Sequence, residues 1–374
     1  MKHVLFIASY APSLIDFRGS LIKNLISKGY KVSVAAPKDK FSNNLQKKLK
    51  DLGVDIHIFK LYRQSLNIFK DFISLLEIYR ILVNLKPNVV ISYTAKAVIY
   101  SGLILKFFNK INYYPLITGL GYAFSEVNII QKKILKFLVI KLYTQALKSS
   151  DKIIFQNKDD QALFLKLKVF KKKNLSGVVN GSGVDLNLYP LTNLPSKPIF
   201  LMIARLLVEK GVREFVRAAE IVRLRFPNAK FQLAGGLDQN PSSISSKELH
   251  LWINQGNIEY LGEVKSVQSI LQSSKIFVLP SYREGIPRSI LEALSTGRPI
   301  ITTDSPGCRE TVIHGKNGLL VPARNATALA KAMIKLLNEK EKTLKKMAKE
   351  SYLFAKNKFE IGKVNKSMLK IMNL

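Results

Sequence analysis

Two glutamates, Glu284 and Glu292, stand eight residues apart around a turn that contains Gly285 and Pro287. A strand is predicted before the turn, at Ile276–Leu279, and a helix after it. We therefore expect Glu284 in the turn and Glu292 two turns into the helix. Backbone N–H groups at the start of such a helix favour polar or anionic ligand atoms. A loop cap and a solvated helix residue would give the same pattern, so the spacing alone leaves both interpretations open.

A second cluster is cationic. Arg205 and Lys210 stand five residues apart in the loop after a predicted strand at Ile199–Ala204, and this loop opens a helix at Gly211. Two fixed cations beside a helix N-terminus are suited to stabilise a diphosphate as it leaves. The alternative is an arginine at a strand end and a solvated lysine, neither of which would do chemistry.

The elements that must position these residues follow from the alternation of short apolar runs with amphipathic helical stretches such as Leu66–Leu85. This alternation predicts parallel sheets with helices on both faces. In the N-terminal half the predicted strands are Val4–Ala8, Val32–Ala36, Val54–Phe59, Val89–Ser92, Tyr113–Ile117 and Ile153–Gln156. After the proline-rich segment Asn187–Pro198, which we predict to be a linker, the further strands are Phe231–Ala234, Ile258–Leu261 and Ile300–Thr303. The further helices are Val212–Arg225, Ala326–Leu337, Lys342–Ala355 and Glu360–Met372.

The length of 374 residues favours two domains, because single cores stop growing at about 250–300 residues. We predict an α/β fold with two Rossmann-like, doubly wound domains, residues 1–190 and 191–357, and a C-terminal helix over residues 358–374 that packs back on the first domain. Ligands of such folds bind beyond the carboxyl ends of the strands. The active site is therefore expected in the cleft between the two domains.

Composition bounds the function further. The chain has 59 Lys and Arg against 26 Asp and Glu, a formal charge of +33, which predicts an anionic partner. A single cysteine, Cys308, excludes an internal disulfide. Four scattered histidines and the lack of an Asp-x-Asp pair predict neither a zinc site nor a metal–diphosphate clamp. With no signal-peptide pattern and no run of about 18 apolar residues, we expect a cytoplasmic location.

Together, these motifs resemble those of the retaining glycosyltransferases of family 4, which have the GT-B fold. The Glu-x7-Glu pattern of residues 284–292 is similar to the donor-site motif of that family, and Arg205 and Lys210 stand where the family contacts the diphosphate of the nucleotide. The resemblance covers nearly the whole chain and is most specific over Leu201–Leu320. It implies a hexosyltransferase that uses a UDP-sugar as donor and needs no metal or other cofactor, because the two cations replace the metal ion.

Carried over residue by residue, the resemblance implies that Glu292 binds the nucleotide ribose and that Glu284 binds hydroxyls of the donor sugar. Backbone N–H groups of Gly285, Ile286 and Arg288 would lie against the sugar and the diphosphate. Further donor contacts are implied at Gly235, Gly262, Val264 and the turn Thr303–Gly307, which resembles the turn that faces the cleft in this family.

The acceptor is expected in the N-terminal half. Arg18, at a predicted helix start, and Lys96, after the strand Val89–Ser92, are candidate contacts for an acceptor phosphate, and a surface arginine is the alternative for Arg18. Two features depart from the family: the first loop lacks a Gly-Gly pair, and Thr118 stands where many members have a histidine. Thr118 cannot act as a general base, so its expected role is hydrogen bonding to the acceptor side of the site.

The stretches Thr118–Phe124, Asp16–Arg18 and Gly235–Ser242 narrow the resemblance to a subgroup that adds a sugar to undecaprenyl-diphosphate-linked saccharides. The implied function is transfer of an N-acetylhexosamine, such as GalNAc, in bacterial surface glycan or glycoprotein assembly. One alternative is a sugar-nucleotide epimerase on the same fold, which the two glutamates and two cations favour less. A second alternative is a nucleic-acid-binding protein. Only the net positive charge supports it, so we expect no nucleic acid partner.

A basic segment, Asn128–Asn174, interleaves apolar residues with lysines. Each lysine near an anionic leaflet contributes about 1 kcal/mol of binding, so we predict peripheral association with the cytoplasmic face of the inner membrane. The alternative is a core helix with a solvated basic face. The lysines are Lys132, Lys133, Lys136, Lys141, Lys148, Lys152, Lys158, Lys166, Lys168, Lys171, Lys172 and Lys173.

Overall fold

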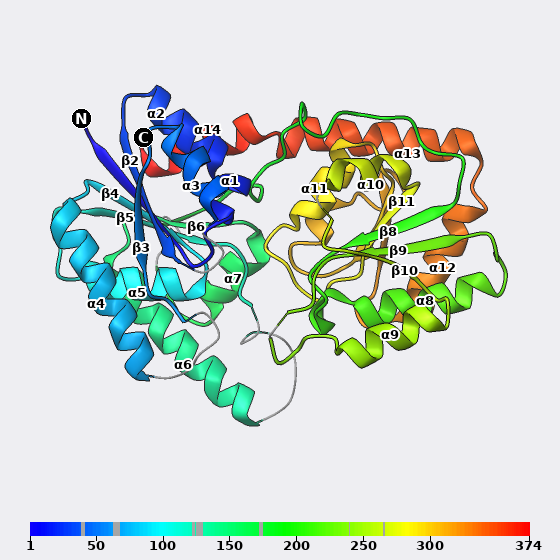
Figure 1. Cartoon of the computed structure of the whole chain (residues 1–374), viewed down its shortest axis with the longest axis horizontal. Coiled ribbons are helices and arrows are strands. Elements are labelled where there is room, and N and C mark those ends of the chain that lie inside the picture. Colours follow the sequence, from blue (N-terminus) through cyan, green and yellow to red (C-terminus); the bar gives the residue numbers. More distant parts are fainter. Residues whose placement is uncertain are drawn as a thin grey trace. The chain divides into compact units, whose positions relative to one another are not determined.

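The computed structural model describes residues 1–38, 42–62, 68–121, 124, 130–171, 175–238, 240–264 and 266–374, with the backbone alone for residues 68 and 130–132. The chain divides into two compact units (Figure 1). The first unit comprises Met1–Ser182 and Val364–Leu374, and the second comprises Gly183–Lys363. Each unit is built around its own parallel sheet.

The sheet of the first unit has seven parallel strands in the order β3-β2-β1-β4-β5-β6-β7. All six strands predicted in this half are present, and β7 is an additional strand at the edge of the sheet. The bounds are β1 His3–Ala8, β2 Lys31–Pro37, β3 Asp55–Phe59, β4 Val89–Tyr93, β5 Asn112–Ile117, β6 Ile153–Phe155 and β7 Ser176–Val178.

Helices cover both faces of this sheet, because its central strands are apolar on both sides. Along β1, Val4 and Phe6 face one core, whereas Leu5 and Ile7 face the other. The first face is covered by α1 Ser13–Asp16, α2 Gly19–Ser27, α3 Asn43–Lys50 and α14 Ile361–Met372. The second is covered by α4 Ile68–Leu85, α5 Ala95–Leu105, α6 Ile130–Ala146 and α7 Lys158–Lys166.

The sheet of the second unit has six parallel strands in the order β10-β9-β8-β11-β12-β13, and β13 is a strand that the sequence pattern did not predict. The strands are β8 Ile199–Ile203, β9 Lys230–Ala234, β10 Glu259–Gly262, β11 Ile276–Leu279, β12 Ile300–Thr303 and β13 Gly318–Val321. The helices are α8 Val212–Arg223, α9 Ser246–Asn254, α10 Val267–Ser273, α11 Arg288–Ser295, α12 Ala326–Leu337 and α13 Glu341–Phe354.

Helix α8 shows how the local sequence fixes the loop that carries the cationic cluster. Its apolar residues Val212, Phe215 and Val216 are buried on one helical face. Gly211 precedes the helix with φ +75°, and a Cβ at this position would meet the carbonyl group of Pro280. Only glycine accepts both conditions without strain, so Gly211 holds the start of α8 against the segment that follows β11.

The predicted linker Asn187–Pro198 is irregular, but it is fixed to the second unit. The buried guanidinium of Arg298 donates to the carbonyl oxygens of Thr192 (2.7 Å) and Asn193 (3.1 Å). Burial lowers the pKa of Arg298 to about 10, so the side chain stays charged at neutral pH and its hydrogen bonds persist. Val184 also pairs with Glu360, and the units accordingly divide after Ser182 and after Lys363 rather than at residues 190 and 357.

The C-terminal residues Val364–Leu374 belong to the first unit. The side chains of Val364, Met368 and Met372 lie in its core, and Asn365 Nδ2 donates to Ser20 Oγ at 2.9 Å. None of the helices in the described ranges combines the length and the apolar content that a bilayer crossing requires.

Candidate active site

The order of strands in the second unit reverses between β8 and β11. At such a point the two loops that leave the carboxyl edge of the sheet diverge, and α/β proteins bind ligands there. The loop after β8 contains Arg205 and Lys210, and the loop after β11 contains Glu284. The two loops are joined, because the backbone N–H of Tyr282 donates to the carbonyl oxygen of Glu209 at 2.9 Å.

The central contact of the site is the ion pair between Lys210 and Glu284. Lys210 Nζ lies 2.5 Å from Glu284 Oε1, and the side chains are 19% and 13% exposed. Ser281 Oγ donates to the same carboxylate oxygen at 2.7 Å, and the backbone N–H of Glu284 donates to the carbonyl oxygen of Pro306 at 2.9 Å. A cation and a carboxylate from distant parts of the sequence are thus held at one point at the edge of the sheet.

The turn Thr303–Gly307 supports the loop that carries Glu284. Gly307 has φ +79°, and a Cβ there would collide with the carbonyl oxygens of Glu284 and Gly285. Thr303 Oγ1 donates to the carbonyl oxygen of Ser281, and Ser305 Oγ donates to the same oxygen at 3.0 Å. The position of Glu284 therefore depends on the close approach of this turn.

Arg205, the other predicted cation, pairs with Asp238. Its Nη1 lies 2.7 Å from Asp238 Oδ2, and the arginine side chain is 57% exposed. Gly235 permits this arrangement, because its φ is +140° and a Cβ would collide with the carbonyl oxygen of Ala204. The stretch Gly235–Ser242 is part of the family resemblance, which gives Asp238 no role of its own. In the structure the carboxylate of Asp238 pairs with Arg205.

Glu292 and Arg288 form an (i, i+4) ion pair on α11, with 2.8 Å between Arg288 Nε and Glu292 Oε1. The side chain of Glu292 is only 10% exposed. The family resemblance implies a role only for the backbone N–H of Arg288, whereas the structure brings its side chain to the glutamate. Gly285 and Ile286 are buried in the turn before α11.

The two remaining donor candidates lie at the end of β10. The carbonyl oxygen of Gly262 accepts a hydrogen bond from the backbone N–H of Gly235 at 2.8 Å, which joins these two predicted residues directly. Gly262 has φ +68°. Val264 is half-buried in the loop that follows, and Lys265 next to it lies outside the described residues.

Tyr282 connects the same loop to helix α8. Its hydroxyl donates to Glu214 Oε1 at 2.7 Å, and the guanidinium of Arg324 lies 4.7 Å from the centre of its ring. Burial, followed by the hydrogen bond to Glu214, raises the pKa of Tyr282 far above its usual value, so the phenol stays protonated. The two partners are 68 residues apart in sequence, and no spacing rule could have paired them.

Removal of this hydroxyl tests whether it positions the Glu284 loop. Tyr282→Phe is expected to lower kcat about fivefold, since a hydrogen bond of this kind contributes about 1 kcal/mol. The KM of the sugar donor should change less than twofold in steady-state assays of transfer. Tyr352→Phe, which alters a half-buried tyrosine on α13, is the matched control. Equal kcat values for the two variants would show that the hydrogen bond does not position the loop.

In the first unit the strand order reverses between β1 and β4, and Arg18 lies near this point. Arg18 is only 2% exposed, so it is not a surface arginine. Its guanidinium lies 5.2 Å from the ring centre of Tyr93, the last residue of β4. The hydroxyl of Tyr93 is 3.0 Å from Ser13 Oγ, and burial raises the pKa of Tyr93 to about 12.

Thr94, directly after β4, has a backbone conformation that is normally reserved for glycine, with φ 72° and ψ 150°. Such a conformation costs about 1–3 kcal/mol and is concentrated at functional sites. The Oγ1 of Thr94 donates to Ser9 Oγ at 2.5 Å, so the residues after β1 and β4 meet at the reversal point. Thr94 could not be identified from the sequence, because a threonine does not normally adopt this backbone conformation.

Lys96 is engaged within the first unit. Its Nζ lies 2.8 Å from Asp71 Oδ1 and 2.8 Å from the carbonyl oxygen of Tyr62. A phosphate would have to compete with this carboxylate, which was not foreseen from the sequence. Thr118 follows β5 and is half-buried, while Tyr122 and Ala123 of the predicted stretch lie outside the described residues. Lys172 and Lys173 lie outside the described residues as well, and so does the side chain of Lys132.

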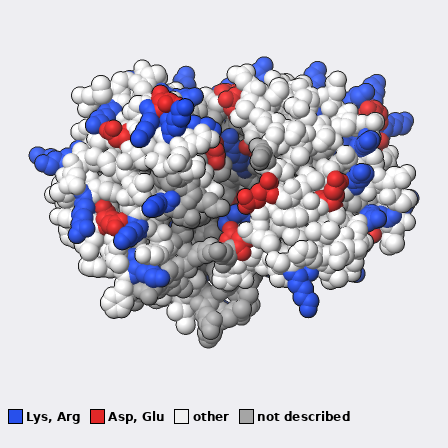
Figure 2. All heavy atoms as spheres, viewed as in Figure 1, with Lys and Arg blue, Asp and Glu red and all other residues white. Residues whose placement is uncertain are grey.

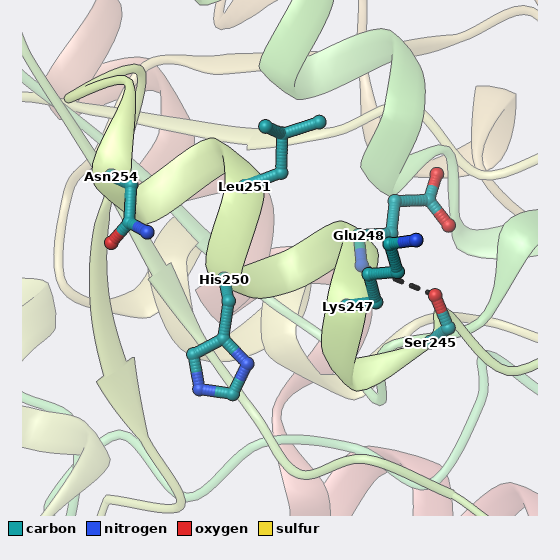
Figure 3. Close-up of a pocket in the computed structure, with 6 residues that line it drawn as sticks. All are labelled: Ser245, Lys247, Glu248, His250, Leu251 and Asn254. Carbon is teal, nitrogen blue, oxygen red and sulfur yellow. Dashed lines mark hydrogen bonds between the residues drawn. The ribbon is translucent and has the colours of Figure 1, made fainter.

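A surface depression of about 610 Å³ lies elsewhere on the second unit, along α9. In Figure 3 its side chains come from this helix and its N-cap and do not converge on one point. None of the predicted donor residues lines it; the lining residues are Ser245, Lys247, Glu248, His250, Leu251 and Asn254. Within the described ranges, no three His, Cys, Asp or Glu side chains gather as metal ligands.

Two doubly wound units, each built on its own parallel sheet, form the architecture of the GT-B class. The comparisons with known proteins agree. Residues 191–354 match the family described as glycosyl transferases group 1, and residues 3–157 match the glycosyl transferase 4-like family. The predicted fold class is confirmed by the structure and by these matches.

The chain is 32% identical over 361 residues to the N,N'-diacetylbacillosaminyl-diphospho-undecaprenol alpha-1,3-N-acetylgalactosaminyltransferase of Campylobacter jejuni, covering 92% of both chains. It is 25% identical over 293 residues to the UDP-Gal:alpha-D-GlcNAc-diphosphoundecaprenol alpha-1,3-galactosyltransferase of Escherichia coli, covering 74% and 73%. Sucrose-phosphate synthase of Thermosynechococcus elongatus has the same fold, with a TM-score of 0.82 at 18% identity over 100% and 98% of the chains. The chain belongs to glycosyltransferase family 4 and is a hexosyltransferase.

Proposed function

We propose that this enzyme transfers an N-acetylhexosamine, such as GalNAc, from a UDP-sugar to a saccharide carried on undecaprenyl diphosphate. The names of the relatives from Campylobacter jejuni and Escherichia coli support this: both acceptors are sugars on diphosphoundecaprenol, whereas the transferred sugars are GalNAc and Gal. The acceptor class is therefore the shared part of the proposal. The sugar is the part that an assay has to decide.

The observation that carries the proposal is the contact between Lys210 and Glu284 at the edge of the second sheet. A bound donor would place its diphosphate between Lys210 and Arg205, so that the lysine partly exchanges its carboxylate partner for phosphate. Glu284, still held by Ser281, would then accept hydrogen bonds from sugar hydroxyls. Glu292 would bind the ribose, with the backbone of Gly285, Ile286 and Arg288 along the sugar and the diphosphate.

Arg205 and Lys210 can stabilise the charge that develops on the leaving diphosphate where they exchange a carboxylate partner for phosphate, and we propose catalysis without a metal ion or other cofactor. We also propose transfer with retention. The acceptor oxygen bonds to C1 on the face from which the C1–O bond to phosphate breaks. The acceptor proton passes to the leaving phosphate oxygen, and UDP departs. No protein base is needed in this step, which is consistent with threonine at position 118.

The acceptor is proposed to bind the first unit, near Arg18, Thr118 and the strained Thr94, with Lys96 as a further phosphate contact if it exchanges Asp71 for the ligand. Because the acceptor is lipid-linked, we propose peripheral association with the cytoplasmic face of the inner membrane, and no nucleic acid partner. The basic helix α6 supports this location: its sequence contains four lysines and no acidic residue.

The experiment is a donor panel assayed by acceptor-dependent UDP or GDP release. UDP-GalNAc, UDP-GlcNAc, UDP-Gal and GDP-Man are each incubated with undecaprenyl-diphosphate saccharides, with and without EDTA. We expect UDP-GalNAc to be used best, no loss of rate with EDTA, and an α-linked product by NMR. Release that does not require the acceptor, or requires a divalent cation, would contradict the proposal.

A further inference from the structure

Helix α4 of the first unit exposes a continuous row of large apolar side chains. Their positions recur at intervals of three and four residues, which places them on one side of the helix. The exposed fractions are high for residues of this kind: Phe69 84%, Phe72 59%, Ile73 41%, Leu76 40%, Tyr79 43% and Val83 38%. The opposite side of α4 is buried, with Ile78 and Leu82 fully enclosed in the core beneath.

Helix α6 repeats this pattern in the same layer. Ile134, Phe137, Leu138 and Leu142 are 57%, 55%, 51% and 42% exposed, again at helical intervals. Both helices pack against α5, which lies between them on the sheet. Just after α5, Phe107 is 77% exposed. We call these side chains of α4 and α6, together with Phe107, the apolar helix surface.

Basic residues outnumber acidic ones in the described parts of α4, α5 and α6. Helices α5 and α6 have no acidic residue in their sequences. The two acids of α4 are engaged: Asp71 pairs with Lys96, and Glu77 accepts from the backbone N–H of Lys60. Besides Lys96, which is paired with Asp71, the basic residues on these helices and the segments that follow them include Lys70, Arg80, Lys86, Lys106, Lys110, Lys133, Lys136, Lys141 and Lys148.

Some of these cations lie close together or against aromatic rings. Lys141 Nζ is 4.6 Å from the ring centre of Phe137, and Lys136 Nζ is 5.7 Å from that of Phe124. Burial and the nearby charge of Lys148 lower the pKa of Lys106. Lysines of this kind lay their stems along apolar surface and extend their ammonium groups to an anionic layer above it.

We propose that the apolar helix surface enters the headgroup region of an anionic bilayer, with α4 as its main apolar element. The proposal rests on the proposed function, because a lipid-linked acceptor brings the enzyme to a membrane. A large exposed apolar patch marks an interaction site. A second copy of the chain fits less well, since a self-complementary contact would bring these lysines against their own copies. An anionic leaflet neutralises the same charges.

Net charge alone does not select this surface. On the face seen in Figure 2, basic side chains are scattered over both units rather than gathered into one patch. What distinguishes α4 and α6 is the row of exposed apolar side chains, on helices whose described residues, taken together, are more basic than acidic. The sequence pattern predicts membrane contact in Asn128–Asn174, a segment that includes α6 but not α4.

Binding to vesicles tests the proposal. Full-length protein is sedimented with vesicles of phosphatidylglycerol and phosphatidylcholine, and with phosphatidylcholine alone. Phe72→Gln with Leu76→Gln is expected to lower partitioning onto the anionic vesicles at least about tenfold, or about 1.4 kcal/mol. The matched control is Leu224→Gln with Leu251→Gln, which alters apolar residues of the second unit that are 90% and 53% exposed. This control should bind as the unaltered protein does.

A second variant, Lys133→Glu with Lys141→Glu, is expected to remove the preference for anionic vesicles. Vesicle binding by the α4 variant that equals that of the control overturns the proposal. Light scattering gives a second result that would overturn the proposal. In that result the unaltered protein is a dimer, the α4 variant is a monomer, and the two proteins bind vesicles equally. An acceptor with a short, water-soluble prenyl chain separates the proposed membrane contact from the proposed function. The α4 variant should use this acceptor as well as the unaltered enzyme does. No turnover by either protein would contradict the proposed function and leave the vesicle result intact.

Discussion

Replacing Lys210 with alanine is expected to lower kcat by about 10²-fold or more. Removal of one preorganised group that stabilises transition-state charge has an effect of this size in other enzymes. Lys210 is well placed for the role, because its ammonium group is held 2.5 Å from Glu284 and is largely shielded from water. The measurement is acceptor-dependent UDP release under saturating donor, with the melting temperature recorded to verify folding.

Two variants make this result specific. Lys346→Ala removes an exposed lysine from α13 and should leave kcat unchanged. Lys210→Arg restores the charge with a different geometry and should recover only part of the rate, since a planar guanidinium does not replace a compact ammonium group. A kcat for Lys210→Ala within threefold of the unaltered enzyme would remove this lysine from the chemistry of diphosphate departure.

Much of the fold could be predicted from the sequence, because buried parallel strands are short apolar runs. The predicted strands Ile276–Leu279 and Ile300–Thr303 coincide with β11 and β12. The edge strand β13 was missed, since it begins with Gly318, which a sequence pattern treats as a turn residue. Gly318 is needed there because a Cβ would collide with the carbonyl oxygen of Ile300 on the neighbouring strand.

The candidate residues of the site could be chosen from the sequence, but their partners could not. The family resemblance implies a diphosphate and a sugar at residues 205, 210, 284 and 292, which stays a prediction, and no spacing pairs Lys210 with Glu284, which is 74 residues away. Lys96 illustrates the same limit, since Asp71 on α4 balances its charge. Prolines in Asn187–Pro198 correctly predicted an irregular segment, but only tertiary packing shows that Arg298 anchors it.

The structure also identifies a glycine on which the position of Glu284 depends. Gly307→Ala is expected to lower kcat/KM about 10²-fold, because a new Cβ would collide with the carbonyl oxygens of Glu284 and Gly285 and displace the loop. A displacement of about 1 Å in a catalytic group can cost a factor of this size. Steady-state transfer assays of the variant and the unaltered enzyme measure the effect.

Gly315→Ala separates this collision from backbone strain. Gly315 has φ +78°, almost the value of Gly307, but no atom lies within 4 Å of a Cβ built on it. Both variants should lose about 1–2 kcal/mol of stability from the left-handed backbone, whereas only Gly307→Ala should lose activity.

Modification of Cys308 gives a second measurement of the position of the turn. Cys308 is fully buried and its pKa is raised to about 11, mainly by burial, so iodoacetamide should modify it slowly. Faster modification of Cys308 in Gly307→Ala alone would show that the turn has moved away from the Glu284 loop. Equal transfer activity in Gly307→Ala and Gly315→Ala would show that the close approach of Gly307 does not position the carboxylate of Glu284.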